Sequence, residues 1–111
     1  MSAQVAVGAP LYPFFSALGD PNRLRIIVRL CDLGPSSTSQ VTKVIPVTRQ
    51  AASKHLQLLE SAGLVTSSRR GRERVWTVQT DPLARASDYL TQLSHRWDAA
   101  VDRLRAYVEE D

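Results

Sequence analysis

Cysteine and long apolar runs are scarce in this chain of 111 residues. The single thiol, Cys31, has no second cysteine in the chain with which to form a disulfide, which favours a reducing, cytoplasmic location. No stretch approaches the roughly 18 apolar residues that a membrane span requires, and the first residues lack the basic start of a signal peptide. We therefore expect a cytoplasmic protein with no membrane partner.

Patterns typical of catalysis and metal binding are also missing. There is no interpretable Ser/His/Asp or Cys/His set, no glycine-rich phosphate loop and no pair of carboxylates in apolar surroundings. His95 and Asp98 lie one helical turn apart, but a divalent-metal site needs three or four converging ligands, which only a dimer could supply here. The sequence predicts a protein that is not an enzyme and that uses no metal or cofactor.

Charge is distributed unevenly along the chain, which carries a net charge of +3. Residues 1–80 contain ten Lys and Arg against four Asp and Glu, whereas residues 81–111 contain four against seven. The basic part could face a polyanion such as DNA, and the acidic tail could not. The length predicts a single domain over 1–111, in which 11–80 form a DNA-binding core and 81–111 a C-terminal dimerisation helix.

Helix signals are clear in the first half of the chain. Residues 11–18 can form a short helix, and a second helix is expected between Asp20–Pro21, a cap followed by proline, and Gly34–Pro35. Helical spacing predicts a core-facing side made of Leu24, Ile27, Val28 and Cys31.

Two further helices around a tight turn are expected next. The first covers about 39–44, Pro46 interrupts it, and Thr48 can cap a second helix over 49–62 that ends at Gly63. This second helix divides into two sides. The side expected to pack comprises Ala51, Ala52, His55, Leu56, Leu58, Leu59 and Ala62. The side expected to meet solvent or a ligand comprises Arg49, Gln50, Ser53, Lys54, Gln57, Glu60 and Ser61.

Four arginines surround Gly71, between two segments rich in β-formers at 65–68 and 74–78. Guanidinium groups placed so close together repel one another, so a hairpin with this tip is best stabilised by phosphates or by a narrow minor groove. The four residues are Arg69, Arg70, Arg72 and Arg74.

A long final helix is expected after Asp81–Pro82. Its apolar residues recur every three or four positions and form a narrow seam over about 26 residues, which suits pairing with a second copy of the chain. The predicted dimer-interface residues are Leu83, Leu90, Leu93, Trp97, Val101 and Leu104.

Together these elements predict a winged helix-turn-helix: a mainly α protein with a small β-hairpin, dimerised through the C-terminal helix. In this arrangement the second helix of the motif enters the major groove. Gln50 suits adenine, Arg49 suits guanine or phosphate, and Ser53 and Lys54 suit phosphate. The predicted DNA-binding residues are Thr48, Arg49, Gln50, Ser53, Lys54, Arg69, Arg70, Arg72 and Arg74. His55 and Gln57 are further candidates, although the wheel favours a buried or half-buried His55.

The residues also resemble a known family. The segments "ALGDPNRLRIIVRL", "TRQAASKHLQLLESAGLV" and "RRGRERVWTV" are similar to the ArsR/SmtB family of bacterial repressors, and the resemblance covers about residues 15–78. It implies a homodimeric repressor that binds double-stranded DNA at an inverted-repeat operator and is released by a signal that alters the dimer. The nature of that small-molecule or other effector stays unknown.

The chain departs from the metal-sensing members of that family. The first helix of the motif, in "SSTSQVTKV", has no Cys-x-Cys element, and Asp88 is followed two residues later by Leu90 rather than by histidine. The resemblance therefore points to a branch without the recognised metal sites.

Two alternatives remain open. A winged-helix module that binds proteins instead of DNA would carry an exposed apolar patch on its recognition helix. A thiol- or metal-responsive sensor of the same family would need Cys31 exposed near its dimer mate, whereas its place among apolar residues favours a small core residue.

Overall fold

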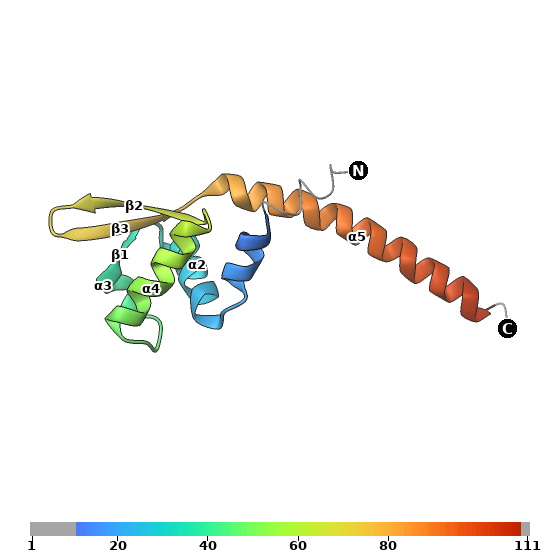
Figure 1. The fold of residues 1–111 in the computed structure, drawn as a ribbon, viewed down its shortest axis with the longest axis horizontal. Coiled ribbons are helices and arrows are strands. Elements are labelled where there is room, and N and C mark those ends of the chain that lie inside the picture. The colour runs from blue at the N-terminus through green and yellow to red at the C-terminus, as the bar shows by residue number, and fades with distance from the viewer. Residues whose placement is uncertain (1–10, 110–111) are drawn as a thin grey trace.

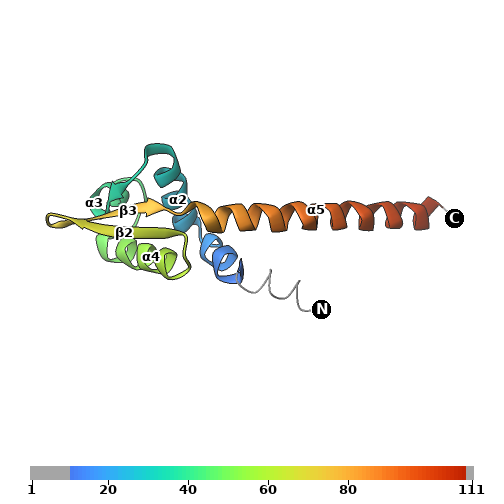
Figure 2. The ribbon, with the colours of Figure 1, turned by 90° about the horizontal axis from the view of Figure 1, so that it is seen from above.

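The computed structural model describes residues 11–109 and places the helices and strands of the motif in one body, from which a single long helix projects (Figures 1 and 2). After a helix at residues 11–18, the elements are α2 (Pro21–Leu33), β1 (Ser36–Ser37), α3 (Thr38–Thr42), α4 (Arg49–Ser61), β2 (Val65–Arg70), β3 (Glu73–Val78) and α5 (Thr80–Glu109). This order confirms the predicted winged helix-turn-helix, mainly α with a small β-hairpin.

Helix boundaries follow the capping residues closely. The carboxylate of Asp20 accepts hydrogen bonds from the backbone N–H groups of Asn22 and Arg23, which starts α2, and Pro21 is its first residue. The hydroxyl of Thr48 accepts from the N–H of Ala51 at the start of α4. Both caps satisfy backbone donors that have no partner inside the helix, so these two helices begin where the sequence predicted.

Gly63 ends α4 in a Schellman motif. Its φ of 84° lies in the left-handed region that favours glycine. The N–H groups of Gly63 and Leu64 donate to the carbonyls of Glu60 and Leu59, and Leu64 is buried beneath the helix end. This turn directs the chain from α4 straight into the hairpin.

The sheet has three antiparallel strands in the order β1–β3–β2. β2 and β3 form the predicted hairpin, which we call the wing, with Arg69 opposite Arg74 and Arg70 opposite Glu73. The strand was expected to end near residue 68, but β2 continues to Arg70, so Arg69 and Arg70 belong to the strand. β1, where Ser36 pairs with Trp76, was not predicted, because two serines carry no strand signal of their own.

The predicted core side of α2 was wrong. Ile26 and Leu30 are buried, whereas Leu24, Val28 and Cys31 are exposed and Ile27 is half-buried. α2 carries apolar residues on more than one side, so spacing alone could not decide which side packs. Ile26 and Leu30, one turn apart, form the side that faces the body.

α4 packs through the side that was expected, with one exception. Ala52, Leu56 and Leu59 are fully buried, but the side chain of Leu58 is 53% exposed. Leu58 lies at the edge of the apolar arc, next to the polar side, so its place in the core was predicted wrongly. The rest of the hydrophobic core comprises Leu11, Phe14, Ala17, Ile26, Leu30, Val41, Ile45, Leu64, Val65, Trp76 and Ala86.

α5 is continuous over 30 residues, about 45 Å. Its first turns pack on the body, where Ala86 is buried and the ring of Tyr89 lies 6.2 Å from that of Phe15. No residue of the described part of α5 after Ala86 is buried. The helix therefore gives the molecule its extended shape, 67 × 30 × 21 Å, and leaves most of its own apolar seam uncovered (Figure 1).

Candidate nucleic-acid interface

The polar side of α4 is open to a ligand. Arg49, Gln50, Lys54 and Gln57 are exposed, and Ser53 is half-buried. Thr48 caps the helix, so its hydroxyl is engaged with the backbone. The predicted DNA-binding residues of α4 thus lie together on one side of the helix, at its N-terminal end and along its middle.

Arg49 is held in position before any ligand arrives. Its guanidinium group donates a hydrogen bond of 2.6 Å to the hydroxyl of Ser39 in α3. The contact links the two helices of the motif across their turn and fixes the direction of a long side chain. Ser39 was not identified from the sequence, since only the packing of α3 on α4 places it within reach.

His55 points into the body rather than along the polar side of α4. Its Nδ1 lies 3.3 Å from a guanidinium nitrogen of Arg23 and 4.0 Å from the Asp20 carboxylate. Arg23 also donates to the backbone carbonyl of Ala17, which ties the helix at residues 11–18 to this cluster. The half-buried position agrees with the helical wheel and favours a structural role over DNA contact.

The carboxylate of Asp20 is stabilised in its charged form at this junction. The hydrogen bond from the backbone N–H of Arg23 is the main cause that lowers the pKa of Asp20, and the charge of Arg23, the N–H of Asn22 and the charge of His55 act in the same direction. Asp20 therefore caps α2 and faces α4 as an anion at neutral pH.

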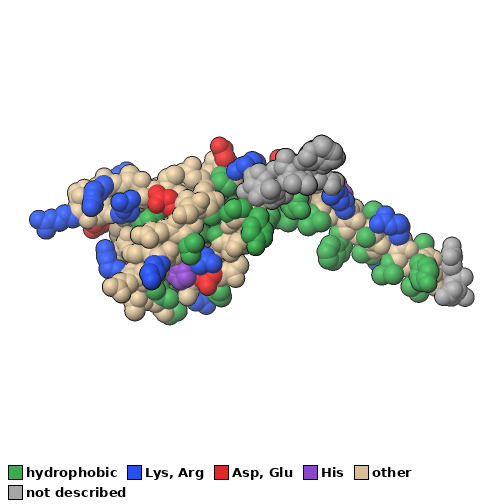
Figure 3. All heavy atoms as spheres, viewed as in Figure 1, with side chains coloured by type: hydrophobic (Ala, Val, Ile, Leu, Met, Phe, Trp, Pro, Cys, Tyr) green, Lys and Arg blue, Asp and Glu red, His purple; other side chains and the backbone are tan. Residues whose placement is uncertain are grey.

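The tip of the wing is an exposed basic feature. Gly71 turns the chain with a φ of 64°, and Arg69, Arg70 and Arg72 are all exposed around it. Within residues 11–109, none of these three guanidinium groups has a hydrogen bond or ion pair. In Figure 3, Lys and Arg side chains project from the wing, and a few more are scattered over the lower part of the body among other side chains.

Arg74 differs from the other three arginines of the cluster. Its guanidinium group donates a hydrogen bond of 2.7 Å to the hydroxyl of Ser67 and lies 5.9 Å from the centre of the Trp76 ring. It therefore points back along the wing toward α4 instead of outward from the tip. Its neighbours in space, Ser67 and Glu60, were not identified from the sequence.

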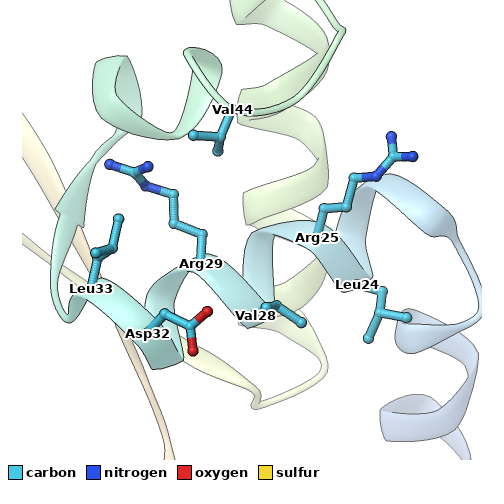
Figure 4. A pocket seen from close by; sticks show the side chains of 7 residues that line it. All are labelled: Leu24, Arg25, Val28, Arg29, Asp32, Leu33 and Val44. Atoms are coloured by element: carbon cyan, nitrogen blue, oxygen red, sulfur yellow. The ribbon is translucent and has the colours of Figure 1, made fainter.

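A hollow with a mostly apolar surface lies on α2, apart from α4 and the wing. Its walls are Leu24, Arg25, Val28, Arg29, Asp32, Leu33 and Val44, enclosing about 540 Å³. Figure 4 shows Arg29 extended toward Val44 while Arg25 and Asp32 point in other directions, so the charged groups do not converge. No residue of α4 or the wing lines this hollow, and it is not part of the basic surface.

The predicted dimer seam is an exposed apolar stripe. Leu83, Leu90 and Leu93 are exposed, Trp97 and Leu104 are 67% and 62% exposed, and Val101 is half-buried. Figure 3 shows hydrophobic side chains along α5, in contrast to the cationic wing. Such a stripe on a single helix is unusual for a chain that has no partner.

The described part of the chain contains no group of three or more His, Cys, Asp or Glu side chains arranged to hold a metal. Cys31, expected in the core, is exposed on α2. Among the helices that the structure describes, none is long and apolar enough to cross a lipid bilayer.

Comparison with known proteins decides the family. The model of a helix-turn-helix domain family matches residues 18–68. The HTH-type transcriptional regulator Rv2034 of Mycobacterium tuberculosis is 36% identical over 97 residues, which cover 87% of each chain. An ArsR-like transcriptional regulator from Rhodococcus sp. RHA1 superimposes with a TM-score of 0.74 at 31% identity, covering 89% of this chain and 92% of that one.

The chain belongs to the ArsR family. It is therefore a DNA-binding transcriptional regulator and not an enzyme. The fold is also similar to that of a homodimeric winged helix-turn-helix domain, Mb0332 of Mycobacterium bovis, with a TM-score of 0.66 at 23% identity over 86% of this chain and 89% of that one. In this ArsR-family chain, α4 is the recognition helix and β2–β3 the wing.

Proposed function

We propose that this ArsR-family regulator is a cytoplasmic homodimeric repressor that binds an inverted-repeat operator in double-stranded DNA. The single observation that carries the proposal is the pairing of two unsatisfied surfaces. One is the cationic surface of α4 and the wing tip, and the other is the apolar seam of α5. The first is suited to phosphates, and the second to another copy of the same helix.

The recognition helix supplies the contacts that read sequence. The exposed side-chain amide of Gln50 can make a bidentate contact to adenine, and Arg49, which is hydrogen-bonded to Ser39, suits guanine or a phosphate. Ser53 and Lys54 contact DNA phosphates and so position α4 on the duplex. Gln57 lies on the same side of the helix. Thr48 acts through the cap that orders the first turn of α4.

The wing supplies sequence-independent affinity. Arg69, Arg70 and Arg72 have no partner among the described residues, so binding DNA does not require them to give up an existing contact. Each phosphate that they neutralise releases condensed counterions and makes binding sensitive to salt. Because the wing also reaches beyond the recognition helix, its tip can enter the neighbouring minor groove.

Dimerisation through residues 81–111 sets the spacing of the two bodies. Pairing along Leu90, Trp97 and Leu104 removes large exposed side chains from water, and the acidic tail keeps this part of α5 away from DNA. Two recognition helices about 34 Å apart would occupy successive major grooves of one face of the duplex, which requires an inverted repeat. Bound in this way, the dimer would exclude RNA polymerase until a signal alters the pairing.

Selection from a random duplex library tests the proposal. The purified chain is expected to shift duplex DNA in a strongly salt-dependent way and to enrich sites with two inverted half-sites whose centres lie about 10 base pairs apart. Enrichment of single, unpaired half-sites would contradict the dimeric arrangement. Failure to shift any duplex in dilute buffer would contradict DNA binding altogether.

Thiol sensing is a second candidate for the releasing signal, because Cys31 is exposed rather than buried. An exposed thiol can be oxidised or can bind soft metals, whereas a core thiol cannot. Peroxide treatment followed by mass spectrometry tests this idea, with operator binding measured on the same sample. A Cys31 that stays unmodified, or a modified protein with unchanged affinity, would exclude it.

A further inference from the structure

The recognition helix and the wing face each other across a polar cavity. Its volume is about 350 Å³, and its walls are Thr38, Ser53, Gln57, Glu60, Arg74 and Trp76. In one wall of the cavity, the indole N–H of Trp76 donates to the hydroxyl of Thr38, which joins β3 to α3. Because the cavity separates part of the wing from α4, polar side chains that cross it can connect the two.

One chain of hydrogen bonds crosses that gap. Arg74 in β3 donates to the hydroxyl of Ser67 in β2 at 2.7 Å, and the same hydroxyl donates to the carboxylate of Glu60 in α4 at 2.9 Å. Ser67 is half-buried and can serve both partners, because a hydroxyl accepts and donates at once. We refer to these two bonds as the Ser67 bridge.

The charges around the bridge explain why Arg74 turns inward. Arg74 lies directly opposite Arg69 in the β2–β3 register, and like charges at such a pair destabilise a hairpin. The negative charge of Glu60 and the face of the Trp76 ring attract the Arg74 guanidinium toward the helix. Arg69 is left alone to project toward a ligand.

We propose that Arg74, Ser67 and Glu60 are positioning residues that fix the wing relative to the recognition helix, and that Arg74 does not itself neutralise a phosphate. The proposal rests on the DNA-binding function proposed above and assigns a different role to one of the four arginines that the sequence predicted to contact DNA. A wing held by the bridge presents Arg69, Arg70 and Arg72 at one angle before DNA arrives. Without the bridge, binding must also order the wing, which lowers affinity although every phosphate is still neutralised.

The salt dependence of binding separates the two roles. Arg72→Ala should lower the slope of log affinity against log salt by about 0.9 for each phosphate that is no longer neutralised. Ser67→Ala removes both bonds of the bridge without changing charge, so it should weaken operator binding about three- to tenfold with an unchanged slope. Arg74→Ala should weaken binding by a similar factor, with less than half the slope change of Arg72→Ala. The double variant of Ser67 and Arg74 should bind only slightly more weakly than either single variant.

Ser68→Ala is the matched control. Ser68 is the next residue on the same strand, points to the opposite face of the wing and is exposed. Its substitution should leave affinity and salt slope as they are. A Ser67→Ala variant that binds like Ser68→Ala, together with an Arg74→Ala variant whose slope falls as far as that of Arg72→Ala, would overturn the proposal and make Arg74 a phosphate contact.

A measurement without DNA keeps the two proposals distinguishable. Backbone amide relaxation by NMR should show lower order at residues 69–74 in Ser67→Ala and Glu60→Ala than in the unsubstituted chain. Glu60→Gln, which keeps an oxygen acceptor for Ser67, should retain most of that order. If the unsubstituted chain bound no duplex, the proposed function would fail, and the relaxation data alone would test the Ser67 bridge. Equal backbone order at residues 69–74 in the variants and in the unsubstituted chain would refute the positioning role of the bridge.

Discussion

The body of the molecule and the outer part of α5 are stabilised in different ways. The body buries Leu30, Leu56 and Trp76 in a core of its own, and caps close both ends of its recognition helix. The outer part of α5, after Ala86, buries none of its described residues and exposes Trp97 and Leu104. The body therefore has a hydrophobic core of its own, whereas the apolar side of the outer part of α5 lies open to solvent and can be covered only by a partner such as the proposed second copy.

This difference places the proposed DNA binding and the proposed dimerisation in separate parts of the chain. The part with its own core carries the basic surface, and the part without one carries the seam. In the proposed dimer, a change in pairing along α5 can therefore alter the distance between the two basic surfaces without unfolding either body. That arrangement suits a protein whose DNA affinity must respond to a signal.

The largest expected effect comes from breaking the seam. Trp97→Glu places a charge at the centre of the proposed interface, where a buried aromatic side chain would contribute several kcal/mol. We expect a monomer whose affinity for an inverted repeat is at least about 100-fold weaker, because each body must bind alone. Size-exclusion chromatography and fluorescence anisotropy measure the two quantities.

Gln92→Glu provides the control for that experiment. It adds the same charge to α5 at an exposed position outside the seam. It should remain dimeric and bind almost normally. Equal losses in both variants would mean that negative charge on α5, rather than loss of the interface, weakens binding.

Removing the wing tip should have the next largest effect. Replacement of Arg69, Arg70 and Arg72 by alanine is expected to weaken binding to all duplexes by roughly ten- to hundredfold at moderate salt and to flatten the salt slope. The dimer should be unaffected. Replacing Arg103 and Arg105 on α5 by alanine removes positive charge away from the basic surface, and a similar loss there would contradict the assignment of the wing.

Gln50→Ala should change sequence preference more than affinity. Loss of a bidentate contact costs about 1–3 kcal/mol of discrimination at the base pair that Gln50 reads. Binding to operator variants at each position, compared with binding to unrelated duplex, shows whether preference is lost at one position. A uniform loss on every duplex would instead give Gln50 a positioning role.

The sequence was most informative where a local rule decides the structure. Asp20, Thr48 and Gly63 marked helix ends correctly, because capping depends on residues only a few positions away. The arginines around Gly71 predicted the hairpin for the same reason. The exposed polar side of α4 followed from helical periodicity.

Features that depend on distant contacts were missed or wrong. Leu24, Val28 and Cys31 were placed in the core, although Ile26 and Leu30 occupy it, because several sides of α2 are apolar. β1 exists only through its pairing with Trp76 and Val75, some forty residues later. The inward turn of Arg74 depends on Ser67 and Glu60, which no local pattern connects to it.

The smallest expected effect is a loss of stability in the body that does not involve the proposed dimer. Thr48→Ala removes the cap of α4 and should lower the free energy of unfolding by about 1 kcal/mol, while Thr48→Ser should retain most of it. Thermal unfolding at two protein concentrations measures this. The loss should be the same at both concentrations, whereas the stability lost in Trp97→Glu should depend on concentration.

The most direct test is the mass of the unsubstituted chain in solution. Sedimentation equilibrium at micromolar concentration, with and without duplex DNA, should give twice the chain mass of 12.3 kDa for the free protein and two chains on each operator duplex. A mass of 12.3 kDa that stays the same when duplex is added in dilute buffer would contradict a dimeric DNA-binding regulator.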